Sequence, residues 1–191
     1  MSLVKSLSVG SGDMFYIKHG ADSFTTIDCC MTDDNQEEIM DEIVEQSKNK
    51  GITRFISTHP DDDHFQHIEY YCKRKPIENF YCVQNEATKS EETDSFKKYK
   101  ELRDGDKSFY VYKNCSRKWL NQGDTTRKGA GLKFLWPDIE NESYMEELNN
   151  AKDGKSPNNI SLIVQYSSGA KFLWLGDIVL DGELQSGVTA N

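Results

Sequence analysis

The 191-residue chain has little histidine: it contains four, and none follows residue 67. Its five cysteines form no C-x-x-C pair and are irregularly spaced, so the sequence predicts neither a zinc finger nor a disulfide framework. No run approaches the roughly 20 apolar residues that a membrane-spanning helix needs, and the first nine residues lack the apolar stretch of a secretory signal. We therefore expect a cytoplasmic protein with reduced thiols and no membrane partner.

Charge is spread unevenly along the chain. The net charge of −9 disfavours nucleic-acid binding, yet residues 73–133 contain 15 basic and 9 acidic residues. We expect a basic insertion at about residues 86–130. It is either a solvated surface or a surface that attracts an anionic substrate, which leaves nucleic acid open as a partner.

The chain is 36% hydrophobic and 11% aromatic, enough for the core of a single domain over residues 1–191. Asp34 followed by Glu37 resembles a capping box for the first helix, and we expect His19 to be exposed in a hairpin turn. Strands that alternate with helices after a first hairpin predict a layered α/β fold. Apolar periodicity predicts strands at about 14–17, 23–27, 52–58, 79–84, 108–113, 132–136, 160–166 and 171–175, and helices at about 35–49, 65–75, 88–103 and 141–150.

The segment at residues 57–64 carries the strongest chemical signal. It reads Ser-Thr-His-Pro-Asp-Asp-Asp-His and directly follows a predicted buried strand. Adjacent carboxylates repel one another unless a cation compensates them. Two neutral imidazoles with several carboxylates form a mixed nitrogen and oxygen ligand set that suits zinc, iron or manganese. The alternative is a solvated, aspartate-rich loop or helix cap with an incidental histidine pair.

Two further aspartates stand at the ends of predicted strands. Asp177 follows the apolar strand 171–175 as part of a Gly-Asp pair, and Asp28 closes the strand at 23–27. Taken alone, each of these aspartates is typical of a turn.

Together these pieces resemble the metallo-β-lactamase superfamily, whose signature is H-x-H-x-D-H after a strand and a later strand that ends in Gly-Asp. The likeness is closest to the branch found in DNA-uptake competence proteins. That branch opens with Gly-x-Gly-Asp, as at residues 10–13, often has Asp at the second histidine, as at Asp61, and carries an Asn-containing stretch, as at 158–164. The resemblance covers residues 8–66 and 157–178 and implies a four-layer αβ/βα sandwich.

The resemblance implies a role for each matching residue. His59 and Asp61 would bind a first metal ion, Asp63 and His64 would bind a second, and Asp177 would bridge the two. Asp63 would also be the catalytic residue that orients an attacking metal-bound hydroxide. The implied cofactor is one or two Zn²⁺ ions, with Mn²⁺ or iron as alternatives.

The chain departs from the family pattern at the later ligands, because the family normally has two further histidines there. Asn158 or Asn159 stands near the first missing position, where an amide can contact water or substrate. His67 is a candidate contact to substrate or water, or a substitute ligand, because on a helix it would share a face with His64. The last ligand would come from sequence beyond Asn191, so we expect a fold that is incomplete at the C-terminus, or a degenerate site.

Three functions follow as hypotheses. The first is a metal-dependent hydrolase that acts on a phosphodiester or another anionic ester of a small molecule. The second is a non-catalytic binding or regulatory module of the same fold with a degenerate metal site. The third is an unrelated α/β protein with a Mg²⁺-binding acidic loop, which predicts that Asp177 lies far from Asp61 and Asp63.

Overall fold

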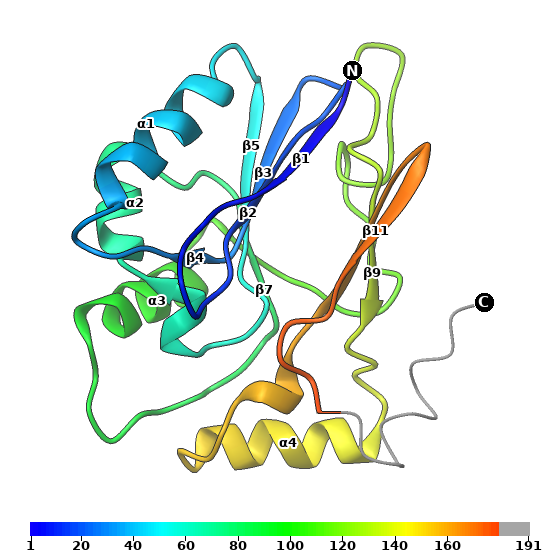
Figure 1. Ribbon diagram of the computed structural model, residues 1–191. Coiled ribbons are helices and arrows are strands. Elements are labelled where there is room, and N and C mark those ends of the chain that lie inside the picture. Colours follow the sequence, from blue (N-terminus) through cyan, green and yellow to red (C-terminus); the bar gives the residue numbers. More distant parts are fainter. Residues whose placement is uncertain (180–191) are drawn as a thin grey trace.

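The computed structural model describes residues 1–179 and shows an α/β fold built on two principal sheets (Figure 1). The larger sheet has the strand order β1-β2-β3-β5-β7-β8, the smaller has the order β11-β10-β9, and β4 pairs with β6. The strands are β1 (Leu3–Ser6), β2 (Phe15–Lys18), β3 (Ser23–Ile27), β4 (Cys29–Cys30), β5 (Ile52–Ile56), β6 (Phe65–Gln66), β7 (Phe80–Cys82), β8 (Ser108–Tyr110), β9 (Leu132–Trp136), β10 (Ile163–Ser168) and β11 (Ala170–Trp174). The helices are α1 (Gln36–Gln46), α2 (Ile68–Arg74), α3 (Asp94–Asp104) and α4 (Glu142–Lys152), with 3-10 turns η1 (Asp62–His64) and η2 (Asn158–Ile160).

The larger sheet brings two chemically important strand ends together. Strands β1, β2 and β3 are antiparallel, whereas β3, β5, β7 and β8 run parallel. Ile27 at the end of β3 pairs with Ile56 at the end of β5. Asp28 and Ser57 therefore leave the sheet side by side, at the carboxyl edge where α/β sheets bind ligands.

Apolar side chains cover both faces of the larger sheet. Helices α1, α2 and α3 pack on one face (Figure 1), and the three-stranded sheet packs on the other. The helical side of the core includes Phe24, Ile39, Met40, Ile43, Phe55, Ile68, Phe80, Phe96 and Tyr99. The side between the sheets includes Ile17, Ile27, Ile56, Tyr81, Leu132, Phe134, Val164 and Tyr166.

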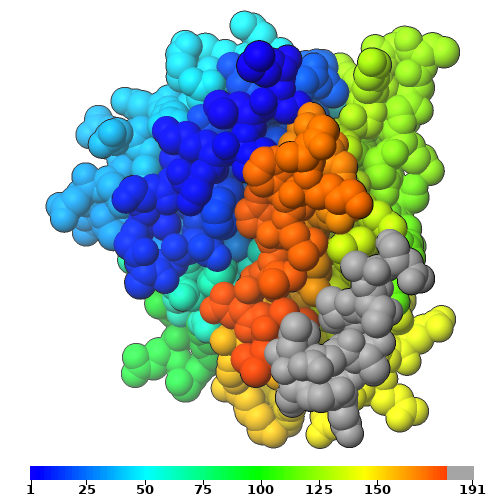
Figure 2. Space-filling model, turned by 45° about the vertical axis from the view of Figure 1, so that its right-hand side comes forward, coloured from blue at the N-terminus to red at the C-terminus, as the bar shows by residue number. Residues whose placement is uncertain are grey.

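The hairpin of β10 and β11 lies against the N-terminal strands, although the two segments are far apart in the sequence (Figure 2). The rings of Phe15 and Trp174 meet edge to face, with centroids 5.9 Å apart. Gly169 forms the hairpin turn with φ of 82°, so the predicted turn at 167–170 is confirmed. This packing fixes the direction in which the chain leaves β11.

The structure confirms the α/β class and contains every predicted helix and strand; the predicted bounds of β3 and β9 match, and those of the other elements are shifted. Strands β1, β4 and β6 were not predicted. The predicted segment at 86–130 contributes α3 and β8, whose side chains Phe96, Tyr99 and Phe109 pack in or against the core. No helix within residues 1–179 is long and apolar enough to cross a membrane.

Two local predictions were wrong. The N-cap of α1 is Asn35, which makes no side-chain capping bond, because its Oδ1 accepts the Thr32 N–H instead. The capping box from Asp34 to Glu37 is therefore absent. His19 is 1% exposed rather than exposed, because its turn packs against Tyr166, whose ring centroid lies 5.0 Å away.

Candidate metal site

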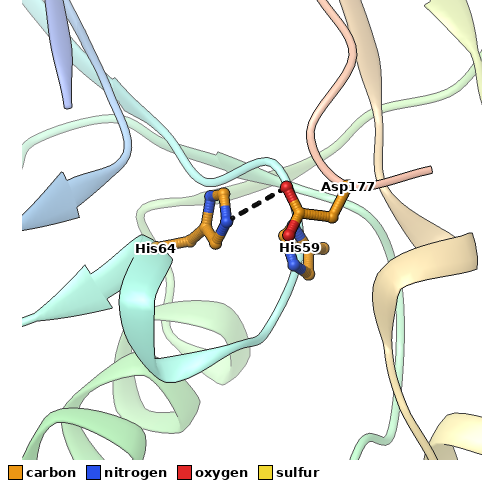
Figure 3. Close-up of side chains that lie close together, drawn as sticks. All are labelled: His59, His64 and Asp177. Carbon is orange, nitrogen blue, oxygen red and sulfur yellow. Dashed lines mark ion pairs between the residues drawn. The ribbon is translucent and has the colours of Figure 1, made fainter. Parts of the chain in front are cut away.

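Three side chains from two distant parts of the sequence converge at the carboxyl edge of the larger sheet. His59, His64 and Asp177 each offer one ligand atom, and these atoms lie within 4.8 Å of one another. His64 Nε2 is 3.4 Å from Asp177 Oδ1, as the dashed line in Figure 3 shows. The two imidazole rings lie 4.1 Å apart, centroid to centroid. Asp177 therefore lies beside His64 of the motif loop, and its charge also acts on Asp63.

The tight turn after β5 places both histidines at one point. Asp61 caps η1 by accepting the Asp62 N–H at 2.9 Å, and the His64 N–H bonds to the Asp61 carbonyl at 3.0 Å. A helix or a strand would send these consecutive side chains to different faces. The compact turn brings His64 back beside His59.

Gly176 delivers Asp177 to the site. Its φ is +56°, and a Cβ at this position would lie 2.7 Å from Ser161 Oγ. Only glycine fits this close approach in a left-handed conformation. The Asp177 N–H then bonds to Ser161 Oγ at 3.1 Å, while Leu162 N–H bonds to the Thr58 carbonyl at 2.8 Å. The Gly-Asp pair is thus tied to the motif loop by Ser161 and Leu162, which immediately precede β10.

Asp28 orients His64 from a fully buried position. Its carboxylate accepts hydrogen bonds from the Thr58 N–H and the Thr58 hydroxyl, both at 2.7 Å, and from His64 Nδ1 at 2.9 Å. With Nδ1 engaged, Nε2 of His64 faces Asp177. Such outer-shell carboxylates fix the orientation of histidine ligands in metal sites. From the sequence, Asp28 was expected only to be a turn residue at the end of a strand. The pattern that could have identified it is its place at the end of β3, the strand that pairs with β5, which leads into the motif.

The two imidazoles differ in charge. Burial opposes protonation of His64, but the hydrogen bond and charge of Asp28, with the charges of Asp177 and Asp63, outweigh it and raise the pKa of His64 to about 9. Burial, together with the charge of His64, lowers the pKa of His59 to about 3. The site therefore pairs a cationic imidazole with a neutral one. A metal ion would take the place of the His64 proton, since imidazole ligands bind metals in the neutral form.

The buried side chain of His59 favours a bound ligand at the site formed with His64 and Asp177. The residue is 1% exposed, and its Nε2 has no hydrogen-bond partner in the described part of the chain. Buried polar atoms are nearly always paired, because an unpaired one costs about 1–3 kcal/mol. A divalent cation would satisfy this nitrogen together with His64 and Asp177.

Two of the predicted metal ligands lie outside this three-residue group. Asp61 faces Lys89, whose Nζ lies 2.7 Å from Asp61 Oδ1 and 2.6 Å from Asp62 Oδ2. Asp63 is half-exposed, with Oδ1 3.9 Å from His64 Nε2. Burial raises the pKa of Asp63 even though the charge of His64 opposes the shift. Asp61 is thus matched with an ammonium group, while Asp63 stands at the edge of the group.

Asn158 and Asn159, which were expected to contact water or substrate, form hydrogen bonds with neighbouring segments of the chain. Asn158 Oδ1 accepts the Ser156 hydroxyl at 2.9 Å. Asn159 donates to Glu147 at 3.0 Å and accepts the Val179 N–H at 3.0 Å. These bonds link η2 to α4 and to the segment after β11.

His67 lies in a different element from His64, so the predicted shared helix face was wrong. His64 ends η1, whereas His67 is the N-cap of α2 and has φ of +62°. Its nearest carboxylates are Glu69 at 3.8 Å from Nδ1 and Asp33 at 3.9 Å from Nε2. The short strand β6 separates the two histidines.

Comparison with known proteins finds no family model and no curated protein that matches this chain.

Proposed function

We propose that the chain is a metal-dependent hydrolase of the metallo-β-lactamase type, in which His59, His64 and Asp177 hold a divalent ion, with zinc first and manganese or iron next. The observation that carries the proposal is the convergence of these three groups, together with the buried Nε2 of His59 that has no hydrogen-bond partner in the described residues. Three protein ligands with one open position are typical of catalytic zinc sites. Such an ion, when bound, supplies a nucleophile at neutral pH by lowering the pKa of water and polarises the bond to be hydrolysed.

The residues around the three ligands have separate tasks in this proposal. Asp28 holds His64 in one orientation through Nδ1. Asp63, half-exposed and 3.9 Å from His64 Nε2, orients the attacking water and accepts its proton. Because burial raises the pKa of Asp63, its carboxylate is a better proton acceptor than a fully solvated one.

A cleft beside the site supports an anionic ester as the substrate. It has a volume of about 330 Å³ and is lined by Pro60, Asp61, residues 87–91 and residues 154–157. Lys89 and Lys155 are the basic residues of this lining, and Asp61 and Glu91 are the acidic ones. Because Lys89 is paired with Asp61, Lys155 is the cation that favours a phosphodiester or another anionic ester, and the size suits a small ligand. The fold alone does not select among the substrates of this superfamily.

We also propose that the fold is a four-layer αβ/βα sandwich. Helices α1 to α3, the six-stranded sheet and the three-stranded sheet would be its first layers. A further helical layer would cover the outer face of the smaller sheet, where Leu173 is 52% exposed and Leu175, just after β11, is 41% exposed. Apolar side chains on that face support a covering layer.

The alternative is a non-catalytic module of the same fold that binds a metal weakly or not at all. The observation in its favour is the pairing of Asp61 with Lys89, which leaves three ligands rather than five around the site. This alternative predicts no turnover.

Metal titration and a phosphodiesterase assay separate the two candidates. Calorimetric titration with Zn²⁺ and Mn²⁺ should show binding that is lost in His59→Ala and Asp177→Ala. Hydrolysis of bis(p-nitrophenyl) phosphate should require the metal and should vanish in the same two variants. Absence of any metal binding at saturation would remove the hydrolase, and binding without turnover of any ester would establish the module.

A further inference from the structure

A second, strongly basic pocket lies at the opposite end of β5 from the metal site. Its volume is about 390 Å³, and its lining includes Ile52, Thr53 and Arg54, the first three residues of β5. We call it the basic pocket. Its charged lining consists of Lys50, Arg54, Arg117, Lys118, Arg127 and Glu78.

Carboxylates balance only part of this charge. Lys118 pairs with Asp124 at 3.1 Å, and Arg127 pairs with Asp22 at 2.8 Å. Glu78, the one acidic residue of the lining, is already paired with Lys107 at 2.9 Å. The other three cations of the pocket form no ion pair within residues 1–179.

Arg54 is the most deeply buried of these three cations, with 3% of its surface exposed. Its Nη2 donates to the Trp119 carbonyl at 2.8 Å, and its Nη1 lies 3.5 Å from the Thr25 hydroxyl. Its Nε has no partner in the described part of the chain. A buried guanidinium without a carboxylate is unfavourable, because its charge has lost water and gained only neutral acceptors.

Arg117 and Lys50 bring two more cations to the same pocket. The Arg117 guanidinium lies over the rings of Tyr81 and Phe109, 5.2 Å and 4.7 Å from their centroids, and its buried Nη1 has no partner among residues 1–179. Lys50 Nζ donates only to the carbonyl oxygens of His19 and Ala21, at 2.8 Å and 3.0 Å. Burial and the charge of Arg117 both lower the pKa of Arg54, so the two guanidinium groups repel each other. An anion in the pocket would reduce that repulsion. Its oxygens would accept hydrogen bonds from the guanidinium and ammonium groups.

We propose that the basic pocket binds a phosphate-type oxyanion of a small molecule, held by Arg54, Arg117 and Lys50. Guanidinium groups suit this ligand because their N–H forks match the oxygens of a phosphate. The Trp119 ring already carries cations of this chain, because Lys118 and Arg127 lie 4.6 Å and 4.9 Å from its centroid. The pocket therefore recognises the anion by charge, whether it comes as free phosphate or as part of a phosphate ester. It does so independently of the metal site.

Titration of the full 191-residue chain with inorganic phosphate, pyrophosphate and AMP tests this assignment. The measurement is calorimetric, at low ionic strength and with a chelator present, so that no metal ion can bind the probe. The variants Arg117→Gln and Lys50→Gln keep Arg54 and the core intact. Lys152→Gln is the matched control, because Lys152 is an exposed lysine paired with Glu86 away from the pocket.

We expect saturable binding of pyrophosphate that falls at least about tenfold in Arg117→Gln and Lys50→Gln, and that changes less than about twofold in Lys152→Gln. Similar affinity for phosphate and AMP would support recognition of the oxyanion alone. Binding of AMP without binding of phosphate would overturn that assignment. An equal loss in the Lys152 control, or no saturable binding to the wild-type chain, would overturn the site. Binding retained in His59→Ala would show that the basic pocket, and not the metal site, holds the probe.

Discussion

Asp28 and His64 are joined by a buried hydrogen bond of 2.9 Å between a carboxylate oxygen and Nδ1. The bond connects the end of β3 to the turn after β5, and it leaves Nε2 of His64 directed at Asp177. The same carboxylate also accepts two hydrogen bonds from Thr58. A residue that never touches the proposed metal therefore sets the geometry of the group that does.

Replacing Asp28 with asparagine should weaken metal binding without removing a ligand. The amide keeps the shape of the side chain but loses the charge that favours a donor at His64 Nδ1. Loss of such an outer-shell partner lowers metal affinity about 10- to 100-fold. Calorimetric titration with Zn²⁺ measures the change, and Asp33→Asn, at a side chain that is 89% exposed, is the control. Equal affinity in the two variants would show that Asp28 has only a structural role.

The histidines of the chain allow a matched comparison at the metal site. His59→Ala removes the buried nitrogen that has no other partner, so we expect at least a 100-fold loss of Zn²⁺ affinity, on the order of 3 kcal/mol. His67→Ala removes a histidine that lies beyond β6, so its affinity should stay within about twofold of the wild-type value. If both variants bound Zn²⁺ as the wild type does, the proposed ligand set would be wrong.

Lys89 should limit the number of ions that the site holds. Its ammonium group lies between Asp61 and Asp62 and so occupies the charge position that a cation would otherwise take. In Lys89→Met the carboxylate of Asp61 is free, so we expect a second equivalent of bound metal or an increase in affinity of about tenfold. Elemental analysis after desalting gives the stoichiometry. The control is Lys152→Met, and a stoichiometry in Lys89→Met that matches this control would contradict the prediction.

The sequence predicted the elements of the fold and the meeting of the motif loop with Asp177, but not how each carboxylate is used. Apolar periodicity indicates which faces of helices and strands are buried, and the resemblance to the family pattern, rather than the Gly-Asp pair alone, predicted that Asp177 meets the motif loop. The partners of Asp61 and His64 depend on contacts between residues far apart in the sequence. Lys89 belongs to the segment that was expected to be a basic insertion, and Asp28 was expected to be a turn residue. The basic pocket was missed for the same reason, since Arg54 is a single cation in an apolar strand.

Gly176 should be far less tolerant of alanine than another glycine with positive φ. A Cβ at Gly176 would lie 2.7 Å from Ser161 Oγ, whereas one at Gly169, in the β10–β11 turn, would meet no atom within 4 Å. Both substitutions carry the left-handed backbone cost of about 1–2 kcal/mol. Only Gly176→Ala adds a clash, and it displaces the backbone of Asp177. Urea unfolding of both variants should show the larger loss in Gly176→Ala, and Zn²⁺ affinity should fall in that variant alone. Similar unfolding free energies in both would show that Ser161 moves aside.

His19 should make the folded state sensitive to mild acid. Burial, with a smaller contribution from the charge of Arg54, lowers the pKa of His19 to about 3, whereas an unfolded histidine has a pKa of about 6.5. Below pH about 6.5 the unfolded chain binds a proton that the folded chain excludes, so the free energy of unfolding falls as the pH decreases. The stability that depends on keeping His19 neutral is fully present above pH about 6.5. Toward pH 3 the free energy of unfolding falls by up to about 1.4 kcal/mol per pH unit. His19→Gln should therefore show a shallower decline than the wild type in urea unfolding at a series of pH values between about 4.5 and 7. A decline in His19→Gln as steep as that of the wild type would mean that His19 is protonated in the folded protein.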